Sequence, residues 1–267
     1  TYKAMIYSDI YLGDRKFPLL AFALHNGHYM PEELLDNCGI DEATRLREED
    51  PYTNGFAECF PNRIIIQTSR FAVDLNRSPQ KAVYQKPEDA WDLPVRNLPL
   101  SEKMKTMLLS SYTDWYKIAR YQIERLLQFN SQLIVLDLHS YNHRRGGPNA
   151  NPDPQCNNPD IILGRNNLPE SVYPYIENLR SSLNGIPFQN TCLDCRCDVK
   201  FAGGYFSRWV NDTFGNRILC LAVEFKKIFM DEWTGELNLT VYNQLKKIFQ
   251  TAVLNWMSET TLVNIER

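Results

Sequence analysis

The stretch Leu133–Tyr141, which has the sequence LIVLDLHSY, most constrains how this chain can fold. A run this short and this apolar is typical of a strand buried on both faces, as in the middle of an α/β sheet. Its last residues would lie at the carboxyl edge of the sheet, where open α/β sheets bind their ligands. A buried strand needs no histidine at its exit to fold, so we predict that His139 is a metal ligand.

Other parts of the chain alternate between strand and helix patterns. Short apolar runs typical of strands span residues 17–24, 63–67, 161–164 and 217–225. Helical periodicity marks residues 31–35, 101–129, 171–183 and 238–257. This alternation predicts a three-layer α/β fold with a mainly parallel sheet. Residues 81–99 lack periodic apolar positions, and we expect a long surface excursion there that could cover a site as a lid.

Composition narrows the class of protein. With 267 residues, of which 43% are hydrophobic, the chain can form one large domain with its own core, and we expect a single domain over 1–267. The net charge of −3 gives no reason to expect nucleic-acid binding. Because no run approaches the roughly 18 apolar residues of a membrane helix, we expect no membrane partner.

The seven cysteines favour reduced thiols and a cytoplasmic location, because their number is odd and the chain is long enough to fold without disulfides. Three of them, Cys192, Cys195 and Cys197, form a tight CLDCRC cluster. A structural zinc site usually takes four ligands in paired spacings, and no second pair is visible. We therefore predict a cysteine-containing turn here and not a second metal site.

The four histidines carry the strongest residue-level signal. They fall in two clusters, His25 with His28 and His139 with His143, and both clusters follow buried-strand patterns. Two histidines and one carboxylate, with an open position for water, form a standard ligand set of hydrolytic zinc. The joint pattern favours a metal site that uses His25 and His139, with His28 and His143 as surface or supporting residues.

Five short segments extend this hypothesis to a family. They are His25–Gly27, Ser69–Arg77, Asp137–Ser140, Phe201–Gly204 and Leu221–Glu224. Their order and content resemble the N-formylglutamate amidohydrolase family over residues 20–250, and the chain is more distantly similar to zinc carboxypeptidases and the aspartoacylase group. The resemblance implies a three-layer α/β/α sandwich whose mixed, mainly parallel sheet has about eight strands.

The resemblance also implies a metal-ligand set. His25 and His139 match the two histidine ligands of the family, and one zinc ion per chain is expected, with another divalent metal as the alternative. Zinc carboxypeptidases have a glutamate three residues after the first histidine, where this chain has His28. The formylglutamate family instead has an acidic residue further along the chain. Asp50 aligns best with that residue, and Glu49 is its rival.

The same resemblance assigns two catalytic roles. Glu224 matches the general base that activates the metal-bound water, and Arg70 would polarise the scissile carbonyl and hold its developing oxyanion. The residue types suit this chemistry independently of the family, because a carboxylate can accept a proton from water and return it to the leaving amine. A carboxylate in the apolar run of Glu224 is also hard to explain structurally, since an unpaired buried charge is costly.

Substrate-binding residues follow from the resemblance in the same way. Asn76 and Arg77 resemble a pair that clamps a substrate carboxylate, and Arg208, which follows the loop of Gly203 and Gly204, would take a second carboxylate. Arginine suits this task because its guanidinium binds a carboxylate with paired hydrogen bonds. From the residues alone, Asp74 and Arg77 could equally form a buried ion pair.

The predicted function is metal-dependent hydrolysis of the amide bond of a small N-acyl amino acid with a free carboxylate, through a zinc-activated water. Two alternatives stay open, a zinc carboxypeptidase-like peptidase and a non-catalytic binding protein that keeps the fold. Many relatives have a Tyr-His pair on the long helix, where this chain has Tyr116 and Lys117. This departure leaves the acyl group and the amino acid of the substrate open.

Overall fold

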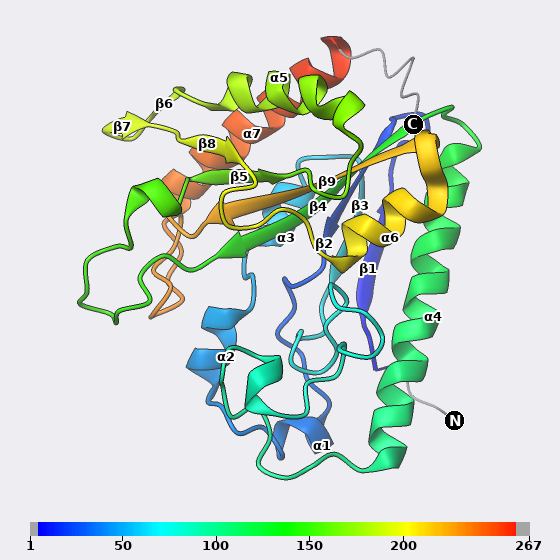
Figure 1. Ribbon diagram of the computed structural model, residues 1–267, viewed down its shortest axis with the longest axis vertical. Helices are drawn as coiled ribbons and strands as arrows, with labels where there is room; N and C mark the ends of the chain where they lie inside the picture. The colour runs from blue at the N-terminus through cyan, green and yellow to red at the C-terminus, as the bar shows by residue number, and fades with distance from the viewer. Residues whose placement is uncertain (1–4, 260–267) are drawn as a thin grey trace.

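The computed structural model describes residues 5–259 and contains one seven-stranded sheet in the order β1-β3-β2-β4-β9-β5-β8 (Figure 1). Its strands are β1 (Ser8–Leu12), β2 (Leu19–Ala23), β3 (Asn62–Ile66), β4 (Leu133–Tyr141), β5 (Ile161–Gly164), β8 (Cys195–Cys197) and β9 (Ile218–Lys226). Neighbouring strands are parallel except at β1–β3 and β5–β9. The mainly parallel α/β class is as predicted, and within residues 5–259 the sheet has one strand fewer than the resemblance implied.

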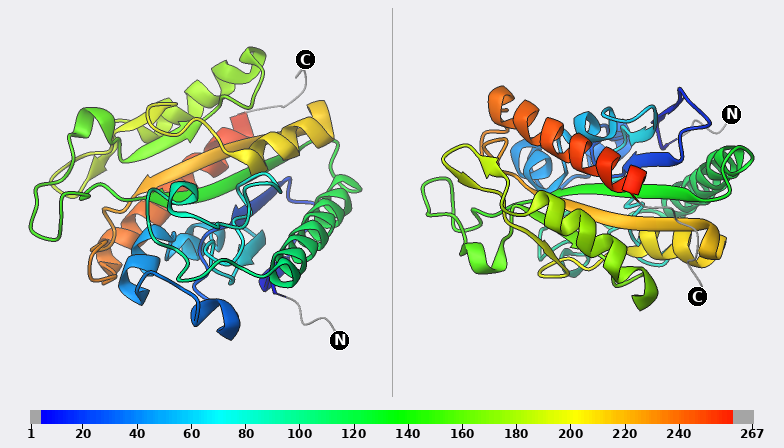
Figure 2. Two further views of the ribbon diagram at one scale, coloured as in Figure 1. Left: turned by 60° about the horizontal axis from the view of Figure 1, so that its bottom comes forward. Right: turned by 90° about the horizontal axis from the view of Figure 1, so that it is seen from above.

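Helices cover both faces of this sheet. The helices of the described residues are α1 (Glu32–Leu35), α2 (Glu42–Glu48), α3 (Thr53–Ala57), α4 (Glu102–Leu127), α5 (Tyr173–Leu183), α6 (Tyr205–Phe214) and α7 (Leu239–Glu259), of which α3 to α7 cover the sheet. Buried residues of α3, α5 and α7 pack against one face, and those of α4 and α6 pack against the other. Figure 2 shows α5 and α7 side by side, with α4 apart from them across the sheet. This arrangement is a three-layer sandwich.

Strand β4 shows how the sequence sets the two faces. Ile134, Leu136 and Leu138 belong to the core under α3, α5 and α7, while Leu133 and Val135 belong to the core under α4 and α6. Successive strand side chains point to opposite faces, so 133, 135, 137 and 139 share one face. That face is apolar at the start of β4 and polar at its carboxyl end, where Asp137 and His139 follow.

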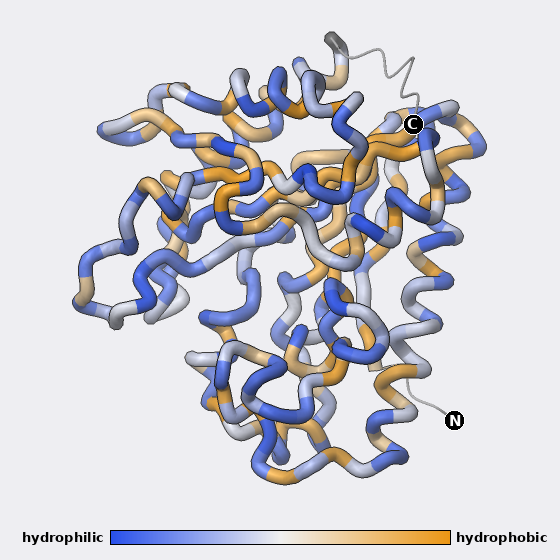
Figure 3. The backbone as a smooth tube through the Cα atoms, in the orientation of Figure 1, coloured by the Kyte–Doolittle hydropathy of each residue, from blue (hydrophilic) through white to orange (hydrophobic). Residues whose placement is uncertain are grey.

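Strand β9 repeats this pattern beside β4. The two strands are parallel, and His139 is paired in register with Glu224. Ile218 and Cys220 lie in the core under α4 and α6, and Ala222 and Glu224 continue the same face. Hydrophobic residues gather along the strands in Figure 3, with hydrophilic residues in the loops beyond them. The polar ends of β4 and β9 therefore form the floor of a site.

Helix α4 holds the loop above this floor. Ser101 caps the helix as predicted, because its hydroxyl accepts a hydrogen bond from the Met104 N–H at 3.2 Å. Further along, the hydroxyl of Tyr112 donates to the carbonyl of Arg77 at 2.8 Å, and the hydroxyl of Tyr116 donates to the carbonyl of Leu75 at 2.7 Å. These two bonds fix the backbone around residues 75–77 against the helix.

Several elements differ from the sequence prediction. The pattern analysis missed β1, α3 and α6, and a small second sheet pairs β6 (Pro187–Phe188) with β7 (Thr191–Cys192). The predicted cysteine-containing turn is only partly right, because Cys195–Cys197 forms the edge strand β8. All seven cysteines are free thiols. No helix within residues 5–259 is long and apolar enough to span a membrane.

Candidate active site

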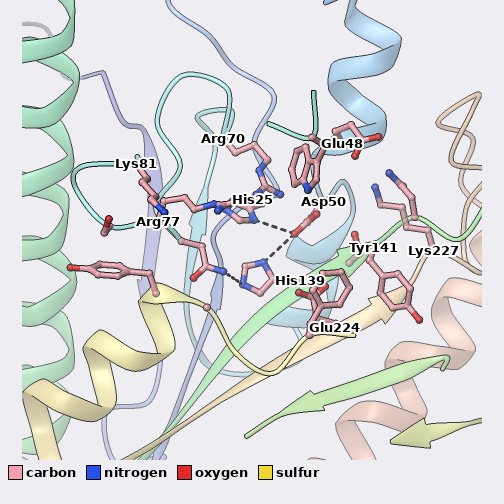
Figure 4. Close-up of a pocket in the computed structure, with 18 of the residues that line it drawn as sticks. His25, Glu48, Asp50, Arg70, Arg77, Lys81, His139, Tyr141, Glu224 and Lys227 are labelled. Carbon is pink, nitrogen blue, oxygen red and sulfur yellow. Dashed lines mark hydrogen bonds and ion pairs between the residues drawn. The ribbon is translucent and has the colours of Figure 1, made fainter. Parts of the chain in front are cut away.

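A cavity of about 540 Å³ lies at the carboxyl ends of β2, β4 and β9 (Figure 4). This edge is where parallel sheets expose the ends of their strands to ligands. Of the predicted site residues, those that line the cavity are His25, Asp50, Arg70, Asn76, Arg77, His139, Gly204, Arg208 and Glu224. The fold thus brings together residues that are spread over most of the sequence.

His25, Asp50 and His139 form the centre of the site. All three are buried, and one potential ligand atom of each lies within 4.8 Å of the others. The Asp50 Oδ2 atom is 3.4 Å from Nδ1 of His25 and 3.1 Å from Nδ1 of His139. The backbone brings Asp50 to this place, because its N–H donates to the carbonyl of His25 at 2.9 Å.

Each of the two histidines has a carboxylate next to its Nε2 atom. Nε2 of His25 is 2.7 Å from Oδ1 of Asp74, and Nε2 of His139 is 2.8 Å from Oδ1 of Asp137. Such a partner fixes the orientation and tautomer of an imidazole and leaves its other nitrogen free to bind a metal. Sequence analysis left the partner of His25 unassigned, since Asp74 was considered only as an ion-pair partner of Arg77.

The central cluster fits a divalent metal ion. Among the described residues, the buried Nδ1 of His25 makes no hydrogen bond, and Oδ2 of Asp50 lies 3.4 Å from it. Two imidazole nitrogens and one carboxylate oxygen are the ligand types that zinc prefers in hydrolytic sites. Burial opposes ionisation of Asp50, but the neighbouring imidazoles of His139 and His25 hold the pKa of that carboxyl well below its usual value. The cluster can therefore offer a charged ligand.

The rival carboxylate, Glu49, is held away from this centre. One of its oxygens accepts a hydrogen bond from the Ser69 hydroxyl, and the other is 2.5 Å from Nδ1 of His28. The second histidine of the other cluster, His143, lies 3.3 Å from Glu232 through its Nδ1. Of the two acidic candidates, Asp50 is the one that the fold places between His25 and His139.

Glu224 and Arg70, the two predicted catalytic residues, both lie in the cavity around this centre. Burial raises the pKa of Glu224 to about 8, the negative charges of Asp50 and Asp137 add to this effect, and His139 opposes it. An Arg70 Nη2–H donates to Asp74 at 2.8 Å, and the guanidinium lies 4.8 Å from the ring centre of Trp91. Its Nε is buried and has no partner among the described residues. Both residues line the cavity.

Asn76 connects the centre to α6. Its Oδ1 accepts a hydrogen bond from the Phe206 N–H at 3.0 Å, and its Nδ2 is 3.3 Å from Nε2 of His139. Gly204 has to be glycine, because an added Cβ would lie 2.3 Å from Oδ1 of Asn76. Gly203 has a φ of +110°, which favours glycine and turns the chain into α6.

The two candidate carboxylate-binding arginines differ in setting. The ion pair considered from the sequence is present, with Nε of Arg77 3.7 Å from Oδ2 of Asp74, but the side chain of Arg77 is 39% exposed and only Asp74 is buried. Arg208 lines the cavity from α6. Lys117, the departure from the Tyr-His pair, is 71% exposed and is paired with Asp114, so it does not reach the site.

Sequence analysis missed several residues that line the cavity. They are Glu48, Lys81, Trp91, Tyr141, Arg145 and Lys227. Three of them carried a usable signal: Lys227 is a charged residue just after a buried strand, and Lys81 and Trp91 lie in the excursion considered as a lid. That excursion does reach the cavity, because Trp91 lies beside Arg70 at its mouth.

The fold and the site together define an α/β protein with a candidate metal centre at the carboxyl edge of its sheet. The chain belongs to the N-formylglutamate amidohydrolase family, whose model matches residues 17–230, and this membership places it among the amidohydrolases.

Two solved structures share this fold. The crystal structure of N-formylglutamate amidohydrolase from Ralstonia eutropha JMP134 is 16% identical with a TM-score of 0.71, and the match covers 96% of this chain and 98% of that one. The gene product Atu2144 from Agrobacterium tumefaciens is 14% identical with a TM-score of 0.56, and the match covers 95% and 96%. No curated protein matches the sequence.

Proposed function

We propose that this protein is a zinc-dependent hydrolase that cleaves the amide bond of an N-acyl amino acid with a free carboxylate, as in N-formylglutamate. The observation that carries the proposal is the buried His25–Asp50–His139 cluster, in which Nδ1 of His25 makes no hydrogen bond with any described residue. These three residues would hold the metal ion. When bound, zinc polarises a carbonyl and lowers the pKa of a water molecule toward about 7.

Glu224 is the proton carrier in this proposal. It lies opposite His139 across the β4–β9 ladder and lines the same cavity. A carboxylate there can take a proton from the attacking water and give it to the leaving amine. Burial raises the pKa of Glu224 above that of an exposed glutamate, so this side chain holds a proton more readily than an exposed carboxylate would.

The arginines give the substrate its orientation. Arg70 is held by Asp74 and stacks against Trp91, so its guanidinium is fixed at a place where it can bind the carbonyl oxygen. Arg77 and Arg208 would bind the carboxylates of the amino acid. The side-chain amide of Asn76 contacts both α6 and His139. In this proposal these contacts orient the carboxylate-binding pair of Asn76 and Arg77, and Asn76 also contacts the substrate.

The proposal also covers the domain organisation, the location and the partners of the protein. We propose that residues 1–267 are a single hydrolase domain, which is supported by two cores that pack against one central sheet. We also propose a cytoplasmic location, which is supported by the seven free cysteines. The partner of the site is then a small molecule, with no role for nucleic acid or a membrane.

A matched pair of histidine variants tests the proposal. Purified protein should contain about one zinc ion per chain and hydrolyse N-formylglutamate, and His139→Ala should lose both properties. His143→Ala is the control, because His143 belongs to the same sequence cluster but lies outside the ligand set. The proposal fails if wild-type protein binds no divalent metal and gains no amidase activity on addition of zinc.

A further inference from the structure

The cavity extends to both sides of the candidate metal centre. In Figure 4, Arg77 and Lys81 lie on one side of His25 and His139, and Tyr141 and Lys227 lie on the other. Because the proposed function places the amino-acid carboxylates at the side of Arg77, the opposite side must receive the acyl group. We call this opposite side the acyl side, formed by Glu48, Tyr141, Arg145, Phe201 and Lys227.

A formyl group would leave the acyl side empty, because the substituent on its carbonyl carbon is only a hydrogen atom. The whole cavity has a volume of about 540 Å³. Pockets of roughly 300–1,000 Å³ suit drug-sized ligands, and N-formylglutamate is smaller than those ligands. The shape of the cavity therefore leaves room for a longer acyl chain beyond the scissile carbonyl.

The acyl side has one apolar surface. The rings of Tyr141 and Phe201 lie 5.4 Å apart and both line the cavity. Tyr141 is buried, at the end of β4 two residues beyond His139. Two neighbouring rings can cover a short hydrocarbon chain and shield it from water.

Charged groups also face the acyl side. Lys227 is 1% exposed, and its Nζ donates to the carbonyls of Arg47 at 2.6 Å and Glu49 at 2.7 Å. An ammonium group has three N–H donors, so the described residues take two of them, and the side chain lines the cavity. Arg145 holds Glu48 with both Nη atoms, at 3.2 Å and 3.1 Å.

The balance of these charges is positive. Glu48 is neutralised by the paired hydrogen bonds of Arg145, which leaves the positive charge of Lys227 without a carboxylate at hydrogen-bond distance among the described residues. A ligand group with a negative oxygen would complete this arrangement. An ammonium group, such as the free amino end of a dipeptide, would instead be repelled by Lys227. The nearby carboxylate of Glu48 could not compensate, because it is already paired with Arg145.

We propose that the acyl group of the natural substrate is longer than formyl and ends in an anionic oxygen that Lys227 and Arg145 bind, while Tyr141 and Phe201 cover its carbon chain. This inference rests on the proposed function and adds the substrate class. The reaction remains hydrolysis: the C–N bond breaks, the water oxygen bonds to the acyl carbon, and the amine takes the proton. The products are an amino acid and a dicarboxylic acid.

A substrate series tests the acyl side directly. The zinc-loaded wild type is assayed for kcat/KM with N-formyl-, N-pentanoyl- and N-glutaryl-L-glutamate and with the dipeptide Ala-Glu. The pentanoyl and glutaryl groups have equal chain length and differ in the terminal carboxylate. We expect the glutaryl substrate to exceed both the pentanoyl and formyl substrates by at least about tenfold, since one charged contact is worth that much.

The outcomes separate this inference from the proposed function. If formylglutamate is hydrolysed at least as well as the glutaryl substrate, or the pentanoyl substrate equals it, the inference is wrong and the proposed function stands. Faster hydrolysis of Ala-Glu also overturns the inference and favours a peptidase. If none of these compounds is hydrolysed, the proposed function fails and the inference fails with it.

Reciprocal variants sharpen the test. Arg145→Met should lower the glutaryl-to-pentanoyl ratio of kcat/KM by about tenfold. Glu48→Gln should raise that ratio, because it frees Arg145 from its partner. Arg77→Met is the control on the opposite side and should lower kcat/KM for both substrates in parallel. A ratio unchanged in both acyl-side variants would contradict the proposal, and Glu48→Gln keeps it testable if Arg145→Met does not fold.

Discussion

Two walls of the cavity are built in different ways. The strand wall consists of the ends of β4 and β9, where His139 and Glu224 are held by a continuous backbone ladder. The loop wall is residues 67–100, which contain a single short 3₁₀ turn at Pro87–Asp89 and carry Arg70 and Arg77. Backbone pairing holds the strand wall in place, and side-chain contacts must therefore hold the loop wall.

A single buried carboxylate organises the loop wall. Asp74 is 0% exposed and accepts hydrogen bonds from Arg70, from the hydroxyl of Tyr84 and from the backbone N–H of Asn76, and it also contacts His25. Its own N–H donates to the Ala82 carbonyl at 2.7 Å. The strand wall is therefore held by many backbone hydrogen bonds, whereas the loop wall is held by side chains, with Asp74 at its centre and Tyr112 and Tyr116 of α4 behind residues 75–77.

Glu224→Gln probes the strand wall and should have the largest effect. The amide keeps the shape of the side chain and cannot accept a proton, so kcat should fall by at least about a hundredfold. Metal content and melting temperature should stay close to wild type, because the ladder around Glu224 is unchanged. Activity near wild type would reject its role as the general base, and loss of metal would make it a ligand instead.

Asp74→Asn and Asp137→Asn form a matched pair across the two walls. Each removes the carboxylate behind one histidine, and loss of such a partner typically lowers metal affinity by about 10–100-fold. Asp74→Asn should also lower the melting temperature, because it removes the charge that holds Arg70. One oxygen of Asp137 makes no hydrogen bond with any described residue, so its variant should be the more stable of the two. Equal melting temperatures would contradict the proposed difference between the walls.

Arg77→Met should have the smallest effect. A hydrogen bond to a charged group is worth about 1.5–3 kcal/mol when buried. Because Arg77 is 39% exposed, solvent screens the contact, and we expect kcat/KM to fall only about tenfold with zinc still bound. Steady-state kinetics with N-formylglutamate measure this effect. A folded, metal-loaded variant as active as wild type would make Arg77 a structural residue.

The strand wall could be predicted from the sequence. The apolar runs of β4 and β9 gave the observed strands within one residue, and their polar ends pointed to His139 and Glu224 without any relative. β1 was missed because it is an edge strand with mostly exposed residues, so its sequence has no buried period. α6 was missed because a glycine loop leads directly into it.

The loop wall could be predicted only through the resemblance. Asp74 meets His25 across 49 positions of the chain, and no local pattern signals such a contact. Arg145 was missed for the same reason, since its importance depends on Glu48, which only the fold brings near. The position of Lys227 just after a buried strand was a local signal, but its two carbonyl partners are brought near only by the fold. Periodicity reports burial along one element, and it carries no information on contacts between loops.

Trp91 makes the loop wall observable by fluorescence. It is 45% exposed and lies 4.8 Å from the guanidinium of Arg70 at the mouth of the cavity, and it is one of five tryptophans in the chain. Indole fluorescence responds to nearby charge and to water. A ligand that reaches Arg70 changes both, so the intrinsic emission of Trp91 reports occupancy of the cavity without a label, and even in variants that no longer turn over substrate.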